Sequence, residues 1–335
     1  MARRHTHIGL AHGNGGRFMR ELIERVFVRH LGNPYLDTRL DAASLPLNGG
    51  DDLAMTTDGF TVQPLEFPGG NIGSLAIHGT VNDLAVSGAV PRFLSLNAFI
   101  EEGVEIALLE RLIEAMAAAA RECGVAIITG DTKVVGRGEC GGVFFATTGI
   151  GVRQPGLCLD AATIRPGDRI LVSGPVGDHG AAVMLARGEF GFSGDLRSDT
   201  ASVLPAARAL SGIEGLRFMR DPTRGGLATV ACELARLTGR GLRLYEADIP
   251  VRDSVAAACE VLGFDPLYMA CEGRVVAVVD PRVAGQALTA LKALMPEAAI
   301  IGEVEAGAGP VIMETGMGGE RVVDELEDDP LPRIC

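Results

Sequence analysis

The sequence predicts a two-domain α+β enzyme that ends in a flexible tail. Its 335 residues exceed the roughly 250–300 at which a single hydrophobic core usually stops growing. Strand and helix patterns alternate along two stretches of comparable length. The last residues are acidic and then rich in proline. We therefore expect one domain at 1–153, a second at 154–322, and an acidic linker with a mobile tail at 323–335.

The composition is that of a soluble globular enzyme with many tight turns, since 47% of the residues are hydrophobic and 45 are glycine. A net charge of −13 disfavours nucleic acid and anionic membranes as partners. No apolar run approaches the roughly 18 residues of a spanning helix, and no apolar segment of a secretory signal follows the basic N-terminus. We expect a cytoplasmic location.

Seven scattered cysteines, with no pair at C-x-x-C spacing, fit neither a disulfide framework nor a structural zinc site. Cys123, Cys232 and Cys259 lie on helical patterns among alanines and leucines, where a cysteine is usually a small buried side chain. The final residue, Cys335, is the one we expect to be exposed.

Cys335 ends an arm that prolines at 330 and 332 keep stiff and extended. The acidic run at 323–329 has too few apolar residues to pack permanently, so we expect it to leave the arm mobile. One interpretation is a frayed terminus with an incidental cysteine. The other is a thiol that is delivered to chemistry elsewhere in the same chain or in a neighbouring chain.

The first domain opens on a glycine-rich loop, 12–16, that leads into a helix beginning near Phe18. Backbone N–H groups at the start of a helix favour an anion, and Arg17 adds positive charge. Such loops are common, so this one alone is weak evidence for phosphate binding.

Strands and helices then alternate through the rest of the first domain. We expect strands at 53–57, 91–99, 125–128 and 143–152, and helices at 74–85 and 108–123. Gly124 ends the longer helix. The run 125–128 is continuously apolar, as is typical of a buried strand.

The second domain begins after the turn at 154–156 and contains two glycine-rich junctions that open helices, at 174–180 and 220–226. We expect strands at 169–173, 274–279, 300–304 and 310–314, and helices at 225–237, 253–262 and 283–295.

Aspartates recur at strand ends and helix starts in both domains. They are Asp51, Asp52, Asp58, Asp83, Asp131 and Asp221. Oxygen ligands without interleaved histidine or cysteine favour Mg²⁺, which binds a few carboxylates together with substrate phosphates. With the glycine-rich loops, this pattern predicts a Mg²⁺–ATP site. The chain lacks the P-loop motif and the protein-kinase motifs. Individually, Asp51 can also be explained as a turn residue and Asp131 as the cap of a neighbouring turn.

Six segments together resemble a known family. They are 12–16, 78–85, 130–135, 177–180, 220–226 and 332–335. They look like the HypE family of hydrogenase maturation proteins, the carbamoyl dehydratases, over essentially the whole chain. That family is similar to aminoimidazole ribonucleotide synthetase (PurM), selenophosphate synthetase and thiamine-phosphate kinase. The resemblance implies a PurM-like α+β fold, a homodimer in which the N-terminal domains pair into a shared β-barrel, and ATP bound near that interface.

The resemblance also implies a reaction and its partners. A carbamoyltransferase, HypF, places a carbamoyl group on the terminal thiol, here Cys335. The protein then uses ATP to dehydrate that group to a thiocyanate. The cyanide passes to iron in a HypC–HypD complex during [NiFe]-hydrogenase assembly.

Residue roles follow from the same resemblance. The implied catalytic residues are Cys335, Lys133, which neutralises phosphate charge, and Glu272, which acts as the base. The implied Mg²⁺ ligands are Asp52, Asp58, Asp83 and Asp221. The implied ATP-binding residues are these four aspartates with His12, Gly13, Gly15, Gly16, Asn82, Gly130, Asp131, Thr132 and Arg224.

Glu272 has an alternative explanation as a turn residue paired with Arg274. Two positions depart from the family pattern: Asn14 replaces a smaller residue, and Cys271 stands where asparagine is frequent.

Two competing functions remain at this stage. The ATP site can serve a diffusible small molecule, as in selenophosphate synthesis or thiamine-phosphate phosphorylation. Selenophosphate synthesis calls for a reactive cysteine near the N-terminal loop, and no cysteine precedes Cys123. The second alternative is a non-catalytic scaffold whose terminal thiol docks a metal.

Overall fold

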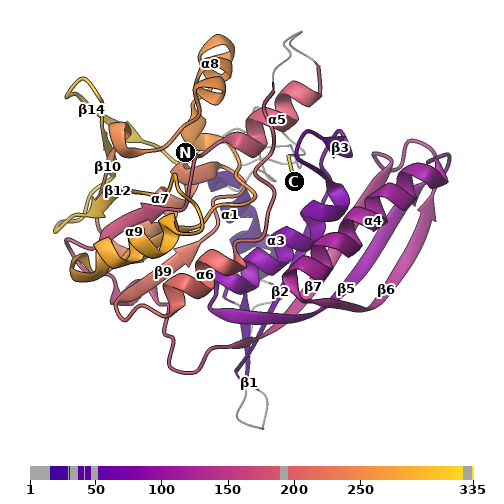
Figure 1. Cartoon of the computed structure of the whole chain (residues 1–335), viewed down its shortest axis with the longest axis horizontal. Helices are drawn as coiled ribbons and strands as arrows, with labels where there is room; N and C mark the ends of the chain where they lie inside the picture. The colour runs from indigo at the N-terminus through magenta and orange to yellow at the C-terminus, as the bar shows by residue number, and fades with distance from the viewer. Residues whose placement is uncertain are drawn as a thin grey trace.

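The structure, a computed structural model, describes residues 16–28, 30, 37–40, 42–46, 52–188, 195–326 and 334–335. Two β-sheets lie side by side, each with helices packed on it, and the C-terminus lies between the two halves (Figure 1). This confirms the expected two-domain fold of mixed helices and sheets. The domain boundaries at 153 and 322 stay predictions.

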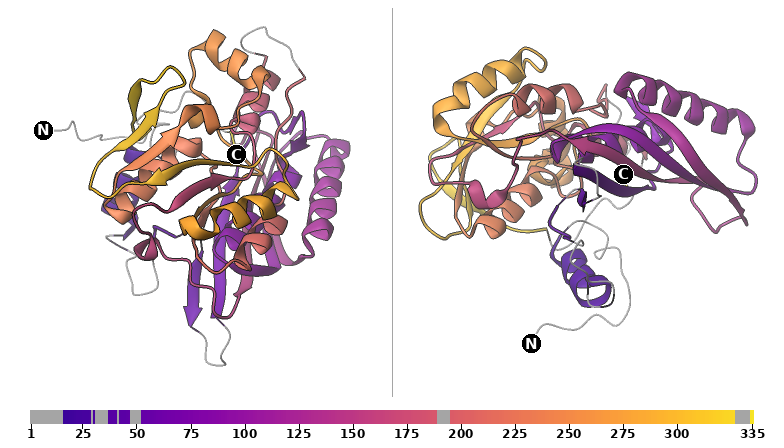
Figure 2. Two further views of the ribbon diagram at one scale, coloured as in Figure 1. Left: turned by 60° about the vertical axis from the view of Figure 1, so that its left-hand side comes forward. Right: turned by 90° about the horizontal axis from the view of Figure 1, so that it is seen from below.

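The first half contains one five-stranded sheet, in the strand order β1-β2-β7-β5-β6. Its elements are α1 (Arg17–Leu22), the π-helical η2 (Ile23–Val28), β1 (Ala43–Pro46), β2 (Asp52–Phe60), β3 (Glu66–Phe67), β4 (Gly70–Asn71), α3 (Ile72–Val86), β5 (Ala89–Glu101), α4 (Ile106–Cys123), β6 (Ala126–Val135) and β7 (Val143–Arg153). β5 and β6 are parallel, whereas β7 is antiparallel to both β2 and β5. α3 packs on the sheet and α4 packs beside α3 (Figure 2).

Strand β6 corrects one expectation. It includes the apolar run predicted as a buried strand, but every side chain from Ala126 to Val134 is exposed. The reason is its position, because β6 lies at the edge of the sheet and pairs only with β5 among the described strands.

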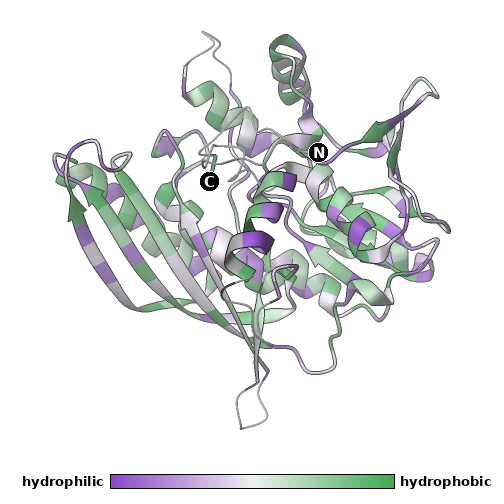
Figure 3. Ribbon diagram, turned by 180° about the vertical axis from the view of Figure 1, so that it is seen from behind, coloured by the Kyte–Doolittle hydropathy of each residue, from purple (hydrophilic) through white to green (hydrophobic). Residues whose placement is uncertain are grey.

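The sheet face opposite α3 and α4 carries hydrophobic residues, and no helix of the described residues lies over it (Figure 3). Phe93 and Phe99 of β5 are 47% and 39% exposed. Phe99 is in register with Lys133, and Asn97 with Asp131, so these residues share that uncovered face.

The second half contains a seven-stranded sheet in the order β14-β13-β10-β12-β8-β11-β9. Its strands are β8 (Arg169–Val172), β9 (Leu216–Arg220), β10 (Leu242–Tyr245), β11 (Val276–Val279), β12 (Ala299–Val304), β13 (Val311–Glu314) and β14 (Glu320–Val323). Its helices are α5 (Asp178–Ala186), α6 (Leu204–Ser211), α7 (Gly226–Thr238), α8 (Asp253–Leu262) and α9 (Ala284–Lys292), with short 3₁₀ turns η3 (Ala161–Thr163), η4 (Glu246–Asp248), η5 (Pro266–Tyr268) and η6 (Pro281–Val283).

One hydrophobic core crosses from the first half into the second. It includes Leu75 and Ile77 of α3 together with Leu204 and Leu210 of α6, and α3 and α6 are in direct contact. A second core lies between the C-terminal sheet and α7, where Leu234 packs with strand residues such as Leu244. The shared core fixes the two halves against each other, so side chains from both can form one site.

The acidic linker is more ordered at its start than we expected. Residues 320–323 form strand β14, and Val323 is buried. Glu325 pairs with Arg236 of α7 at 3.2 Å and also with Arg20 of α1. The stretch 327–333 lies outside the described residues. Across the described ranges, no helix combines the length and the apolar character needed to cross a membrane.

Candidate active site

A cavity of about 140 Å³ lies where the two halves meet, and three of the six aspartates that the sequence singled out line it together with Glu272. Its lining residues are Asp58, Phe60, Gly79, Asp83, Asp221, Thr223, Arg224, Glu272 and Cys335. They come from β2, α3, the turn before α7, the loop before β11 and the C-terminus.

Helix α3 positions Asp83 because its start is well defined and almost all of its surface is buried. The side chain of Asn71 accepts hydrogen bonds from the N–H groups of Gly73 and Ser74, and the Ser74 hydroxyl accepts one from the N–H of Asn71. At the other end of the helix, the Thr56 hydroxyl of β2 donates to Oδ2 of Asp83 at 2.8 Å. This bond ties the carboxylate to the strand that also carries Asp58.

Gly79 is required where α3 crosses β2. A Cβ atom at this position would lie 2.8 Å from the ring of Phe60, closer than real carbon contacts, and 3.6 Å from Oδ2 of Asp58. The missing side chain therefore keeps the cavity open beside Asp58.

Asp58 lies at the end of β2 and accepts a hydrogen bond from the N–H of Gly59 at 2.9 Å. Burial raises the pKa of its carboxyl group, and the positive charge of Arg224 partly offsets that effect. The cavity thus contains a carboxylate and a guanidinium whose charges act on each other.

The turn that carries Asp221 and Arg224 depends on two glycines. Gly225 and Gly226 have φ values of 75° and 57°, in the left-handed region that favours glycine. A Cβ on Gly226 would also lie 2.5 Å from the backbone oxygens of Leu267 and Met269. The glycine pair lets the chain turn tightly into α7, which places Asp221 and Arg224 at the cavity.

Glu272 is 2% exposed, and its Oε1 has no hydrogen-bond partner among the described residues. Burial, with the negative charges of Asp221, Asp199 and Asp58, raises the pKa of Glu272 well above its ordinary value of 4.5. Burial and the neighbouring carboxylates therefore favour the neutral form of this carboxyl group.

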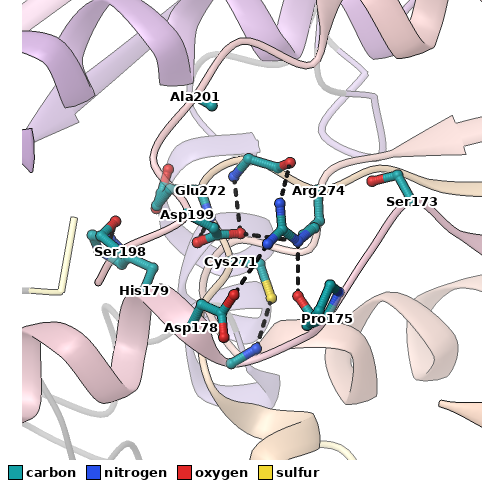
Figure 4. A network of polar contacts seen from close by, with 12 residues as sticks. Ser173, Pro175, Asp178, His179, Ser198, Asp199, Ala201, Cys271, Glu272 and Arg274 are labelled. Atoms are coloured by element: carbon teal, nitrogen blue, oxygen red, sulfur yellow. Dashed lines mark hydrogen bonds and ion pairs between the residues drawn. The ribbon is translucent and has the colours of Figure 1, made fainter. Parts of the chain in front are cut away.

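Arg274 is not the partner of the Glu272 carboxylate. It pairs with Asp178 at 3.1 Å and with Asp199 at 3.5 Å, as Figure 4 shows. The backbone N–H of Glu272 donates to Asp199 at 3.1 Å. The alternative explanation of Glu272 as a turn residue paired with Arg274 is therefore wrong, and this network holds the backbone while the side chain faces the cavity. At the neighbouring position, Cys271 is buried and its sulfur accepts from the N–H of Gly177 at 3.2 Å.

The C-terminus is docked inward. The backbone N–H and the hydroxyl of Thr61 donate to the oxygen of Cys335 at 3.0 and 3.2 Å. His179 is hydrogen-bonded to the carbonyl oxygen of Ile334 at 2.7 Å, and Ile334 is 5% exposed. Cys335 is half-buried at the cavity, so our expectation that it would be exposed is wrong, whereas Cys158 is exposed.

Several predicted site residues lie elsewhere. Asp52 stands at the opposite end of β2 from Asp58, about 20 Å away at the rise of a strand, and its carboxylate is 3.6 Å from Arg153. It does not join the other three aspartates within one chain. Gly130, Asp131, Thr132 and Lys133 lie on the exposed strand β6, where Asp131 and Lys133 pair at 2.8 Å.

Asn82 also differs from its predicted role. Its amide nitrogen donates to the backbone oxygens of Ala201 and Glu272, at 3.0 and 3.3 Å, and its side-chain oxygen accepts from the N–H of Val203 at 2.8 Å. The side chain is buried and bridges the two halves, so it is already occupied and does not face the cavity. Gly16 precedes α1 and is buried, while His12, Gly13 and Gly15 lie outside the described residues.

Sequence reasoning missed the residues that hold the tail, Thr61 and His179, and the partner of Asp83, Thr56. His179 lies inside the glycine-rich segment 177–180, so the sequence marked the place but not the function. Thr56 and Thr61 flank Asp58 in and after β2, where no pattern distinguishes them from ordinary strand threonines.

Two family models match the chain. The AIR synthase related protein N-terminal domain matches residues 39–153, and the AIR synthase related protein C-terminal domain matches residues 165–314. The matches cover the two halves of the fold. They confirm the expected PurM-like architecture, since AIR synthase is aminoimidazole ribonucleotide synthetase.

Full-length relatives narrow the assignment. The chain is 49% identical to the carbamoyl dehydratase HypE of Azotobacter vinelandii, covering 99% of this chain and 98% of the relative. A chain in the crystal structure of a HypE–HypF complex is 44% identical with a TM-score of 0.85, covering 91% of this chain and 99% of that one. The structure of HypE in complex with ATP is 45% identical with a TM-score of 0.81, covering 97% and 99%. With its paired AIR synthase related domains and its terminal cysteine, the chain belongs to the HypE family of carbamoyl dehydratases.

Proposed function

We propose that this chain uses ATP to dehydrate a carbamoyl group carried by the Cys335 thiol to a thiocyanate, and so supplies the cyanide ligands of a [NiFe]-hydrogenase iron centre. The observation that supports the proposal most directly is the position of Cys335, which lines one cavity with Asp58, Asp83, Asp221 and Glu272. A thiol attached to the end of the chain is thereby placed among residues suited to binding a metal–nucleotide complex. Full-length relatives bear the name carbamoyl dehydratase, and one was solved with ATP.

The chemistry requires the amide oxygen to become a leaving group. Bound ATP supplies a phosphoryl group for that oxygen, so the carbamoyl thioester and ATP give the thiocyanate, ADP and phosphate. The oxygen departs in the phosphate, and the two amide protons are lost from nitrogen. Glu272 is suited to accept an amide proton, because a carboxylate with a raised pKa is a stronger base than an ordinary one. Arg224 lies where its charge can neutralise phosphate oxygens.

The donor set at the cavity fits Mg²⁺. Asp58, Asp83 and Asp221 offer carboxylate oxygens from three different elements, and an unpartnered oxygen of Glu272 is nearby. In the described part of the chain, no three histidine, cysteine or acidic side chains already form a group that could hold a metal. Mg²⁺ usually binds one or two carboxylates plus substrate phosphates. We therefore assign these aspartates as ligands that complete their site only with the nucleotide present.

The proposed active form is a homodimer in which the uncovered faces of the N-terminal sheets pair into a shared barrel. The exposed strand β6 and the exposed rings of Phe93 and Phe99 support this arrangement, since edge strands and apolar sheet faces are usually covered. Asp131 and Lys133 lie on that face. Their predicted roles at the nucleotide therefore depend on a second chain.

The proposed partners are HypF, which carbamoylates Cys335, and a HypC–HypD complex, which receives the cyanide. A relative is known in a HypE–HypF complex. The tail must leave the cavity for each of these encounters and return for dehydration.

Intact-mass analysis tests the proposal. The chain is incubated with HypF, carbamoyl phosphate and ATP; we expect a carbamoyl adduct that then loses one water. Cys335→Ala should acquire neither change. ATP turnover that persists in Cys335→Ala would favour the small-molecule enzyme, whereas an adduct that never loses water would refute dehydration.

A further inference from the structure

The last two residues are held by donors from both halves of the molecule. Thr61 follows β2, three residues after Asp58, and His179 lies in the first turn of α5. Both donors of Thr61 converge on an oxygen of Cys335. The tail is thereby tied to both halves, through the backbone oxygens of Ile334 and Cys335.

The imidazole of His179 has one defined tautomer. The carbonyl oxygen of Ile334 can only accept, so Nε2 carries the proton and donates at 2.7 Å. Nδ1 is then the acceptor for the Ser198 hydroxyl at 2.8 Å. The ring is completely buried, and burial lowers the pKa of His179, so the ring is neutral.

The environment of His179 fixes the direction of that donor. Figure 4 shows Ser198 beside the ring. The Ser198 hydroxyl accepts from the N–H of Thr200 at 3.0 Å, and its backbone N–H donates to the carbonyl of Pro68 at 2.8 Å. The ring of Phe67 meets the imidazole edge to face at 5.4 Å. The histidine is therefore a fixed hydrogen-bond donor to the tail, and it does not line the cavity that contains the aspartates and Glu272.

The side chain of Ile334 provides the apolar part of the contact. It lines a second cavity of about 200 Å³ with Phe264, Tyr268, Met269 and Ala270. Cys335 lines the other cavity, the one that contains the aspartates, so the two last residues occupy two neighbouring cavities.

We infer that Thr61 and His179 form a tail clamp, which binds the backbone oxygens of Ile334 and Cys335 and so positions the carbamoylated thiol for dehydration. Neither residue reacts; both act by positioning. Each hydrogen bond accounts for about 2- to 10-fold in the docking equilibrium, which leaves the tail able to exchange. The consequence for dehydration rests on the proposed function, whereas docking of the tail can be measured without any reaction of the carbamoyl group.

The test is the rate at which iodoacetamide alkylates Cys335 in the full chain, read by peptide mass mapping with exposed Cys158 as the internal reference. Thr61→Val removes the hydroxyl, and His179→Asn removes the N–H donor at the position of Nε2. We expect each change to raise Cys335 alkylation about 2- to 10-fold relative to Cys158.

Conservative variants separate positioning from general structural damage. Thr61→Ser keeps the hydroxyl, and His179→Gln places an amide N–H near the position of Nε2, so both should restore slow alkylation. Variants that weaken docking should also dehydrate the carbamoyl group more slowly. Thr61→Ser and His179→Gln should restore the dehydration rate. Carbamoylation by HypF should persist in all variants. Unchanged alkylation in both Thr61→Val and His179→Asn would overturn the clamp. If the variants change the alkylation of Cys335 as expected but the carbamoylated wild-type chain never loses water, the proposed function is refuted while the clamp is supported.

Discussion

Glu272 is buried among other carboxylates, an arrangement that an ordinary structural glutamate avoids. Its neighbours Asp221, Asp199 and Asp58 all disfavour its charged form, and its Oε1 has no hydrogen-bond partner in the described ranges. Holding such a group reduces folding stability wherever the unfolded chain would ionise it. Perturbed pKa values of this kind cluster at sites of proton transfer, where function offsets the loss of folding stability.

Glu272→Gln should reduce dehydration about 100-fold or more, because the amide cannot accept a proton. The same variant should be more stable than the wild type near neutral pH. The pKa of Glu272 is higher in the folded chain than in the unfolded chain, so above about pH 4.5 the folded state binds more protons and wild-type stability falls as pH rises. Glutamine removes this dependence.

Urea unfolding between about pH 5 and pH 8, alongside single-turnover dehydration, measures both effects. The stability advantage of Glu272→Gln should grow with pH. Glu260→Gln, at an exposed position on α8, is the control and should change neither quantity. A pH-independent difference between wild type and Glu272→Gln would show that Glu272 is ionised in the folded chain.

At the scale of elements, helix α3 serves two purposes with adjacent residues. Consecutive helical residues are about 100° apart, so Asp83 reaches the cavity while Asn82 reaches the junction between the halves. Asn82 bonds to backbone groups of Ala201, Val203 and Glu272, and thereby ties α3 to the segments before α6 and β11. One helix thus fixes both a candidate ligand and the position of the candidate base.

The paired variants Asn82→Ala and Asp83→Asn should separate these purposes. Asn82→Ala leaves buried backbone groups without partners and should lower the free energy of unfolding by about 1–3 kcal/mol, with little change in ATP affinity. Asp83→Asn keeps a side chain that can accept from Thr56, but it removes a negative charge and should weaken Mg²⁺–ATP binding with little loss of stability.

Denaturant unfolding and calorimetric ATP titration in the presence of Mg²⁺ measure the two properties. If Asn82→Ala weakens ATP binding as strongly as Asp83→Asn does while remaining stable, Asn82 contacts the nucleotide and its bridging role is secondary.

At the scale of the whole molecule, one large surface of the chain is unsuited to remain in water. Within the described ranges, helices cover one face of the N-terminal sheet, and the other face carries Phe93, Phe99 and the exposed strand β6 (Figure 3). The predicted residues Asp131 and Lys133 belong to this surface and not to the cavity. Dimer formation and completion of the site are therefore linked in the proposed function.

Phe93→Glu should convert the proposed dimer to monomers, because it places a charge on the sheet face that the second chain would cover. Light scattering after size-exclusion chromatography measures the mass. The folded monomer should keep its circular dichroism, since Phe93 is 47% exposed within one chain, but it should lose dehydratase activity. Val261→Glu, at a 65% exposed position on α8, is the matched control and should leave mass and activity unchanged. A wild-type chain that is already monomeric and active would contradict the proposal.

The sequence alone determined the features that depend on local pattern. Apolar spacing predicted most elements, including α4 and its end at Gly124, whose φ of 68° requires the left-handed region. The aspartates near turns and the thiol of Cys335 predicted the type of chemistry, because residue type is a property of the sequence itself.

Only the tertiary structure decided which of these residues meet. Asp58, Asp83 and Asp221 converge while Asp52 does not, β6 is exposed despite its apolar run, and Asn82 turns away from the cavity. Thr61 and His179 reach the tail although they are far from it in the chain. The physical reason is that a cavity is formed by contacts between distant segments. The residues of a strand determine which side chains share a face. The packing of α3, α5 and the turn before α7 then decides what each of those side chains contacts.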